Sequence, residues 1–188
     1  MDKFFIIANR QKDKELKTAR KVEAYLNSKG KSCILREETS EQKARSNHYT
    51  DVEKIPKDVE CIIVIGGDGT LLQAARDVVN RQIPLLGINM GTLGYLAEID
   101  RSSIDGALNH LMLDEYTIEK RMMLNGKVYH KEELIAEDVA LNDIVIGRDG
   151  PLHVTRFHNY VNGEFLNSYT ADGIIIATAT ARPDTACQ

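Results

Sequence analysis

The sequence predicts an α/β domain built on a parallel sheet, followed by the start of an all-β domain. In the first half, short apolar runs alternate with segments of helical spacing, which is typical of a parallel sheet. Glycine-rich motifs directly follow two of these apolar runs. In the second half, apolar runs follow one another without a long helical segment between them. We therefore expect an α/β domain over residues 1–113 and a β domain over residues 114–188.

Composition and charge narrow the function classes. The 188 residues are 43% hydrophobic, enough for a core, and the formal net charge of −4 gives no sign of a nucleic-acid-binding surface. The cysteines Cys33, Cys61 and Cys187 are widely spaced, and Cys61 lies in an apolar run, as a core residue would. No apolar run reaches membrane-spanning length, and the pattern of a signal peptide is missing. We expect a soluble cytoplasmic protein without nucleic-acid or membrane partners.

The first elements alternate between strand and helix. Residues 4–8 predict a short strand, and residues 12–29 carry apolar side chains at helical spacing. Those side chains are Leu16, Ala19, Val22, Tyr25 and Leu26. Gly30 is typical of the position after a helix, and residues 32–35 predict a second strand. The polar residues 36–57 indicate a mobile surface segment.

Two further pairs of strand and helix complete the first half. Residues 61–65 are continuously apolar, as in a buried strand, and residues 71–79 predict the next helix. Another strand is predicted over residues 84–88 and another helix over residues 103–113. Ligands of such parallel sheets bind beyond the carboxyl ends of the strands.

The second half predicts strands only. They are expected over four ranges, residues 116–128, 134–146, 154–161 and 165–177. Asn162 and Gly163 separate the last two, and an Asn-Gly pair between apolar runs is a strong signal of a hairpin turn. These features indicate the opening of an antiparallel β domain.

The most informative stretch is Gly-Gly-Asp-Gly-Thr at residues 66–70, between the strand 61–65 and the helix 71–79. Glycines let the backbone approach a phosphate, and a helix N-terminus offers N–H groups and partial positive charge to an anion. Asp68 would repel a phosphate. Its carboxylate therefore indicates a different task, either removing a proton from a hydroxyl or holding a magnesium ion. The alternative is an ordinary turn between strand and helix.

A second glycine motif, Asn-Met-Gly-Thr-Leu-Gly, occupies residues 89–94. By itself such a sequence is more often a loop with two tight turns. It follows the strand 84–88, however, and the carboxyl ends of parallel strands share one edge of a sheet. We therefore expect it to lie beside the first motif.

Polar residues within the predicted β domain have weaker signals. Asn142 and Asp143 interrupt an apolar run, and neighbours in a strand point to opposite faces. The pair could hold the two hydroxyls of a ribose, or belong to a solvent-exposed face. Asp172 has the alternative role of a turn residue, and the lone histidines His153 and His158 are more often structural than functional.

In their order along the chain, the motifs resemble those of the NAD kinase family. The match consists of residues 66–70, 89–96, 141–143 and 171–176, and it covers nearly the whole chain up to Thr180. The first motif is shared with diacylglycerol- and sphingosine-type lipid kinases, and approximately with phosphofructokinases. The other three motifs distinguish NAD kinases.

The resemblance implies a Rossmann-like α/β domain, of the phosphofructokinase and diacylglycerol kinase type, followed by a sandwich-like β domain that binds NAD. It implies transfer of the terminal phosphoryl group of ATP, or of polyphosphate in some members, to the 2′-hydroxyl of the adenosine ribose of NAD. The product is NADP. Members need a divalent metal ion, with Mg²⁺ expected here, and are usually homodimers or homotetramers. The motifs leave open the donor and the choice between NAD and NADH.

The resemblance also implies roles for single residues. Asp68 would accept the proton of the hydroxyl, Gly69 would contact the dinucleotide, and Gly67 would help Gly69 and the metal ion to neutralise phosphate charge. The further NAD contacts are Asn142, Asp143, Thr170, Asp172 and, more weakly, His153. No residue is assigned as a metal ligand.

Two other functions are alternatives, a lipid kinase of the same superfamily and a nucleotide-binding remnant without catalysis. The pair Asn142 and Asp143 and the residues 93–96 favour NAD over a lipid as the acceptor. A remnant would bind nucleotide without turnover.

The tail departs from the family pattern. After Thr180 the pattern continues approximately Gly-Ser-Thr-Ala/Gly-Tyr-Ser-Leu-Ser, whereas residues 181–188 match nothing in it. One set of codons that can encode this tail is GCT CGA CCG GAT ACA GCC TGT CAG, and one G placed before them changes the reading to Gly-Ser-Thr-Gly-Tyr-Ser-Leu-Ser. We hypothesise that one nucleotide is lost after Thr180, in the gene or by sequencing error. Resequencing the gene tests this hypothesis.

The segment expected beyond Thr180 would supply further NAD contacts and most of the β domain. Without it, strand edges stay unpaired and an apolar face stays uncovered, which favours aggregation. We therefore expect the truncated 188-residue chain to have little kinase activity alone. NADP formation at ordinary rates would contradict this expectation.

Overall fold

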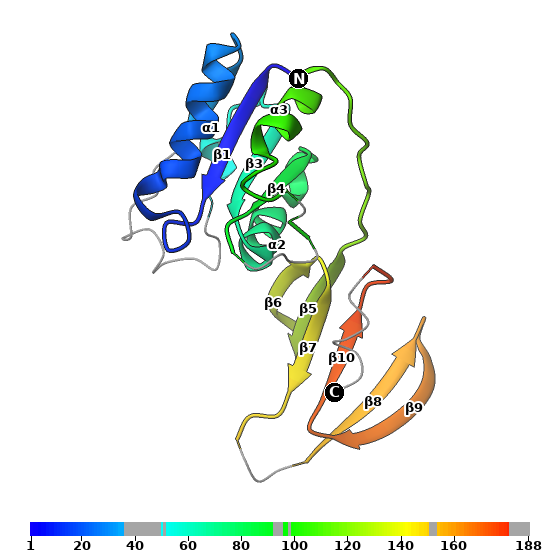
Figure 1. Cartoon of the computed structure of the whole chain (residues 1–188). Helices are drawn as coiled ribbons and strands as arrows, with labels where there is room; N and C mark the ends of the chain where they lie inside the picture. The colour runs from blue at the N-terminus through cyan, green and yellow to red at the C-terminus, as the bar shows by residue number, and fades with distance from the viewer. Residues whose placement is uncertain (36–49, 51, 92–95, 98, 151–153, 181–188) are drawn as a thin grey trace. The chain divides into compact units, whose positions relative to one another are not determined.

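The computed structural model describes residues 1–35, 50, 52–91, 96–97, 99–150 and 154–180. The chain forms two compact units, Met1–Glu119 and Lys120–Gln188, which we describe separately (Figure 1). Most of the expected surface segment 36–57 lies outside the described residues. None of the helices in the described ranges is long and apolar enough to cross a membrane.

The first unit contains a four-stranded parallel sheet (Figure 1). Its strands are β1 (Lys3–Ala8), β2 (Ser32–Leu35), β3 (Cys61–Gly66) and β4 (Leu85–Asn89). They lie in the order β2-β1-β3-β4, and every pairing is parallel. The predicted parallel sheet is thus confirmed. The chain passes from β1 to β2 on one side and then crosses to β3 on the other side of β1. Sheets of this kind usually bind ligands at such a change of direction, here beyond the carboxyl ends of β1 and β3.

Helices cover both faces of this sheet. Helices α1 (Lys17–Ser28) and α3 (Ile104–Met112) pack on one face, and α2 (Asp68–Asp77) packs on the other. Short 3-10 helices occur at η1 (Lys14–Leu16), η3 (Val52–Lys54) and η4 (Val79–Arg81).

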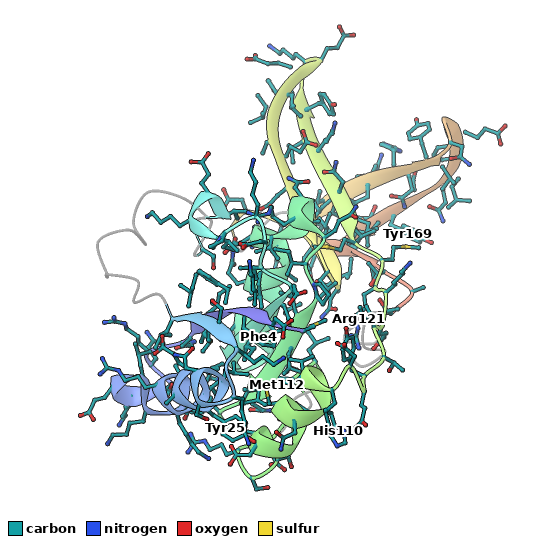
Figure 2. All side chains as sticks on the ribbon, turned by 90° about the horizontal axis from the view of Figure 1, so that it is seen from above. Phe4, Tyr25, His110, Met112, Arg121 and Tyr169 are labelled. Atoms are coloured by element: carbon teal, nitrogen blue, oxygen red, sulfur yellow. The ribbon has the colours of Figure 1, made fainter. Side chains whose placement is uncertain are left out.

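Alternate residues of the strands enter the two core layers. Phe4 and Ile63 belong to the layer under α1 and α3, whereas Ile62 belongs to the layer under α2. Figure 2 shows Phe4 near Tyr25 and Met112, which pack against the first layer. All six residues of β3 are buried, which explains the continuous apolar sequence of this central strand.

Helix α1 begins later than the sequence predicts. The expected start at residue 12 is wrong, since the first α-helical residue is Lys17 and both Glu15 and Leu16 have positive φ angles. The start is determined by the side chain of Asp13, whose two oxygens accept the backbone N–H groups of Thr18 and Ala19 at 2.9 Å. At the other end, Gly30 has a φ of +74°, as expected for the residue after a helix.

Replacing Asp13 with alanine is expected to lower the free energy of unfolding by about 1–2 kcal/mol, because two N–H groups at the start of α1 lose their acceptor. Asp13 is only 2% exposed, so water cannot readily replace it. Urea unfolding followed by far-UV circular dichroism measures the loss. The control is Glu15→Ala in the same loop, whose side chain is exposed and pairs with the exposed Lys17. Equal stability of the two variants would contradict the capping role of Asp13.

Helix α2 begins earlier than expected. The sequence predicts its start at residue 71, but the first helical residue is Asp68, and Gly67 occupies the N-cap position. The carbonyl oxygen of Gly67 accepts the N–H groups of Thr70 and Leu71. Residues 68–70 of the glycine motif therefore lie in the first turn of the helix, and this places Asp68 at the helix N-terminus.

The second unit consists of antiparallel strand pairs. The strands are β5 (Leu124–His130), β6 (Glu133–Ala140), β7 (Asp143–Gly147), β8 (Thr155–Val161), β9 (Glu164–Ala171) and β10 (Gly173–Ala177). They pair as β5 with β6, β7 with β10, and β8 with β9. The predicted start of an all-β domain is confirmed.

Three of the predicted strands have wrong bounds. The strand expected over residues 116–128 begins only at Leu124. The run 134–146 is two strands, because β6 pairs with β5 whereas β7 pairs with β10, and the chain changes partner at Leu141 and Asn142. The run 165–177 is likewise divided at Asp172. An apolar pattern does not indicate where a strand exchanges one partner for another.

The predicted hairpin turn is confirmed. Asn162 and Gly163 join β8 to β9, and both have positive φ angles, as the favoured two-residue turn requires. Next to the turn, the rings of Tyr160 and Phe165 pack edge to face with their centroids 5.5 Å apart.

The cysteines of the described residues are unreactive by environment. Cys61 is buried in β3, and burial raises the pKa of its thiol to about 12. Burial likewise raises the pKa of Cys33 to about 12. The thiolate, which is the reactive form, is therefore scarce at both positions at neutral pH. Cys61 is a core residue, as the sequence predicts, and Cys187 lies outside the described residues.

Candidate active site

The two glycine motifs meet at the carboxyl edge of the parallel sheet. The backbone N–H of Met90, just after β4, donates to the carbonyl of Gly66 at the end of β3 over 2.7 Å. The N–H of Asn9, just after β1, donates to the carbonyl of Ile65 over 2.8 Å. Three loops thus leave the sheet side by side, as expected for the two motifs. Residues 92–95 of the second motif lie outside the described residues.

Asp68 is held at the start of α2 by the chain that follows β4. Its Oδ1 atom accepts the backbone N–H groups of Leu96 at 3.3 Å and Ala97 at 3.2 Å. This chain is itself tied to the sheet, because the N–H of Asn89 donates to the carbonyl of Ile99 over 2.7 Å. The predicted catalytic carboxylate is therefore held by the chain that follows the second glycine motif.

The loop after β1 adds residues that the sequence analysis missed. The Nδ2 atom of Asn9 donates to Thr70 Oγ1 over 3.2 Å, and this oxygen also accepts the N–H of Gly67 at 3.4 Å. The Oδ1 atom of Asn9 accepts the N–H of Gln11 at 2.9 Å. Asn9 therefore joins the loop after β1 to the first turn of α2. Its position directly after a predicted strand was the one available signal.

Lys12 lies in the same loop, and its ammonium group lies against Gly67 of the first motif. A Cβ atom built on Gly67 would come within 2.3 Å of Lys12 Nζ, and one built on Gly91 within 3.9 Å. The ammonium group thus lies against one glycine of each motif. A side chain at position 67 would have to displace the flexible end of Lys12. Lys12 carried no sequence signal of its own.

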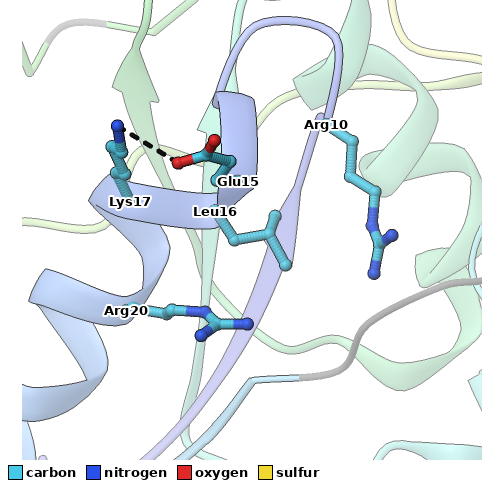
Figure 3. Close-up of a pocket in the computed structure, with 5 residues that line it drawn as sticks. All are labelled: Arg10, Glu15, Leu16, Lys17 and Arg20. Atoms are coloured by element: carbon cyan, nitrogen blue, oxygen red, sulfur yellow. Dashed lines mark ion pairs between the residues drawn. The ribbon is translucent and has the colours of Figure 1, made fainter.

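A surface hollow of about 410 Å³ lies nearby along the same segment (Figure 3). Its lining residues are Arg10, Glu15, Leu16, Lys17 and Arg20. Glu15 pairs with Lys17 over 3.1 Å at its rim. The hollow contains none of the predicted site residues, and we do not assign it to the site.

Asn142 and Asp143 lie at one end of the β7–β10 pair. Asp143 is the first residue of β7 and lies opposite Ala177. The carbonyl of Asn142 accepts the N–H of Thr178 at 2.7 Å, and the Oγ1 of the buried Thr178 donates to the carbonyl of Leu141 over 3.2 Å. Hydrogen bonds to Thr178 therefore hold the backbone beside Asn142 and Asp143 in place.

Asp172 lies at the opposite end of the same pair. It follows β9 at the bend before β10, and its carboxylate pairs with the guanidinium of Arg148 over 3.2 Å. Gly173, the residue after Asp172, pairs with Gly147, which lies four positions after Asp143 in β7. Four positions correspond to roughly 13 Å along a strand. The structure does not bring Asp172 together with the pair Asn142 and Asp143.

Thr170, another predicted site residue, lies in the β8–β9 pair of the second unit. Thr170 is in β9, opposite Arg156 of β8. His158 has its Nδ1 2.7 Å from Ser168 Oγ on the neighbouring strand, in agreement with a structural role. His153 lies outside the described residues.

Comparison with known proteins decides the family. Residues 4–116 match the family described as ATP-NAD kinase N-terminal domain. The chain belongs to the NAD kinase family. This confirms the family predicted from the four motifs, and no comparison favours a lipid kinase.

Relatives in the NAD kinase family support the same assignment. The chain is 47% identical over 180 residues to the NAD kinase of Lachnospira eligens, covering 96% of this chain and 61% of that protein. It is 46% identical to the NAD kinase of Agathobacter rectalis, covering 96% and 62%. The chain thus spans about three fifths of the length of the curated relatives it matches.

Solved NAD kinase structures share the fold. The yeast NADH kinase complexed with NADH superposes with a TM-score of 0.80 at 23% identity, covering 99% of this chain and 60% of that one. An NAD kinase from Archaeoglobus fulgidus in complex with ATP gives a TM-score of 0.61 at 17% identity, covering 93% and 60%. These likenesses establish the fold.

Proposed function

We propose that this chain carries the catalytic centre of an NAD kinase. The reaction transfers the terminal phosphoryl group of ATP, or of polyphosphate, to the 2′-hydroxyl of the adenosine ribose of NAD and gives NADP. The observation that carries the proposal is the place of Asp68, a carboxylate at a helix N-terminus where two glycine motifs meet. Membership of the NAD kinase family supports the choice of acceptor.

The chemistry assigns one proton acceptor. A ribose hydroxyl is a poor nucleophile, and Asp68 would take its proton as the oxygen attacks the terminal phosphorus. A new bond forms between the ribose oxygen and phosphorus, and the bond to the leaving ADP or shortened polyphosphate breaks. Such transfers need alignment and charge neutralisation more than covalent help. Gly67, Gly69 and Mg²⁺ would neutralise charge, and the hold of Asn142 and Asp143 on the dinucleotide would align the acceptor.

We further propose that the second unit binds NAD. Asn142 and Asp143 would hold one part of the dinucleotide, and Thr170 and Asp172 another, with His153 as a weaker contact. The separation of Asp143 from Asp172 suits an extended ligand with two nucleotide halves. The proposal corresponds to an α/β domain over residues 1–113 and a β domain over residues 114–188.

Mg²⁺ is the divalent ion we propose. In the described ranges, no three His, Cys, Asp or Glu side chains gather into a metal-binding cluster. Mg²⁺ commonly keeps several waters and is held by substrate phosphates and one or two carboxylates. Asp68, at the helix N-terminus proposed to face those phosphates, fits this limited protein contribution. When bound, the ion would neutralise phosphate charge.

We also propose a cytoplasmic homodimer or homotetramer without nucleic-acid or membrane partners. Large apolar side chains of the second unit are exposed, among them Val145 at 61% and Leu166 at 62%, and a further protein surface would cover them. The free thiols of Cys33 and Cys61 suit a reducing compartment. The net charge of −4 disfavours nucleic acid.

An assay of NADP formation tests the proposed function. The 188-residue chain and a chain with the reading frame restored after Thr180 are each given Mg²⁺ and NAD or NADH, with ATP or polyphosphate as donor. Diacylglycerol replaces the dinucleotide in a parallel reaction. Phosphorylated dinucleotide from the restored chain is the expected result. Phosphorylation of the lipid alone, or nucleotide binding without any turnover, would overturn the proposal in favour of one of the two alternatives.

A further inference from the structure

The backbone around Lys12 is held on both sides. The carbonyl of Asn9 accepts the N–H of Lys12 at 3.0 Å and the N–H of Asp13 at 2.8 Å. Asp13 is buried and caps α1, while Asn9 bonds to Thr70 in the first turn of α2. The loop therefore has a defined path from β1 across the start of α2 to α1, and this path carries Lys12 past the first glycine motif.

The exposed ammonium group of Lys12 lies beside a second source of positive charge. Its nearest glycine, Gly67, is the N-cap of α2, and the N-terminus of a helix carries partial positive charge. In the part of the chain that the structure describes, no carboxylate lies within ion-pair distance of Lys12 Nζ. Asp68 Oδ1 is turned to the N–H groups of Leu96 and Ala97. A multiply charged anion in contact with both Lys12 and the start of α2 would balance both positive groups.

We infer that Lys12 binds the phosphate chain of the donor and stabilises the negative charge of the transferred phosphoryl group. This inference rests on the proposed function, since it concerns the same site. Lysine binds phosphate as a point charge, and its Nζ atom lies next to a glycine of each motif. Lys12 and Asp68 then have different roles in the reaction. The ammonium group neutralises the donor oxygens while the carboxylate takes the proton of the acceptor hydroxyl.

Substitution of Lys12 by methionine tests the inference. Methionine keeps the length of the side chain and removes its charge, so we expect the dissociation constant for ATP and for inorganic tripolyphosphate to rise about tenfold. The rate of NADP formation should fall about 10²-fold, because a donor of charge stabilisation is lost from the transition state. NAD affinity should stay unchanged. Isothermal titration calorimetry on the 188-residue chain measures binding, and the restored chain gives the rate.

Two further variants control the experiment. Lys14→Met removes a charge from the same loop at an exposed position and should change neither constant. Lys12→Arg keeps the charge and should recover part of the lost affinity. Circular dichroism establishes that each variant is folded.

The outcomes separate this inference from the proposed function. Unchanged tripolyphosphate affinity in folded Lys12→Met would overturn the role of Lys12, even if the wild-type chain makes NADP. A second outcome is that tripolyphosphate affinity depends on Lys12 while the frame-restored chain without substitutions forms no NADP. This result would support the phosphate site and overturn the kinase proposal. Equal losses of phosphate affinity in Lys12→Met and Lys14→Met would show that the effect comes from the change in net charge alone. This result would also overturn the inference.

Discussion

Replacement of Asp68 by asparagine is expected to lower the rate of NADP formation by about 10²–10⁴-fold in the frame-restored chain, because the proposed proton acceptor is lost. Asparagine keeps an oxygen that can accept the N–H groups of Leu96 and Ala97, so the first turn of α2 should keep its structure. The affinity for NAD should therefore change little. Initial rates at saturating NAD and ATP, together with NAD titrations, measure the two effects.

Asp105→Asn is the matched control for this experiment. Asp105 lies in the first turn of α3, as Asp68 does in α2, but its exposed carboxylate pairs with Lys21 over 3.3 Å. Its substitution should leave the rate unchanged. Full activity of the Asp68→Asn enzyme would remove the observation on which the proposed mechanism depends. A loss of NAD binding equal to the loss of rate would instead identify Asp68 as a binding residue.

Replacement of Ile63 by alanine is expected to destabilise the first unit by about 2–5 kcal/mol, the usual range for removing a large aliphatic side chain from a packed core. Ile63 is 0% exposed at the centre of β3, between strands β1 and β4. It lies in the layer that α1 and α3 cover. Urea unfolding of the 188-residue chain, followed by the helical signal in circular dichroism, measures the change.

Ile135→Ala provides the comparison at an exposed position. Ile135 is 58% exposed in β6, so the same loss of atoms should change stability by no more than about 0.5 kcal/mol. A similar loss in both variants would indicate that the second unit buries Ile135 in an assembly. An unchanged midpoint for Ile63→Ala would contradict the proposed core.

Local signals located most of the elements but not their ends. The strand around Ile63 and the helix around Leu26 were recognisable, because burial on two faces and on one face leaves different apolar patterns. The start of α1 was misplaced, since it depends on the buried side chain of Asp13 rather than on spacing. The turn at Lys131 and Glu132 has positive φ angles without any turn residue to signal it.

The sequence by itself determined the family and the identity of the proposed proton acceptor, because four motifs in a fixed order depend only on residue types and their spacing. Tertiary structure decided which other side chains share the site. Asn9 and Lys12 lie more than fifty residues before Gly67, and only the parallel pairing of β1 with β3 brings their loop to the glycine motif. Contacts of this kind arise from the order of strands in the sheet, and no local pattern in the loop records that order.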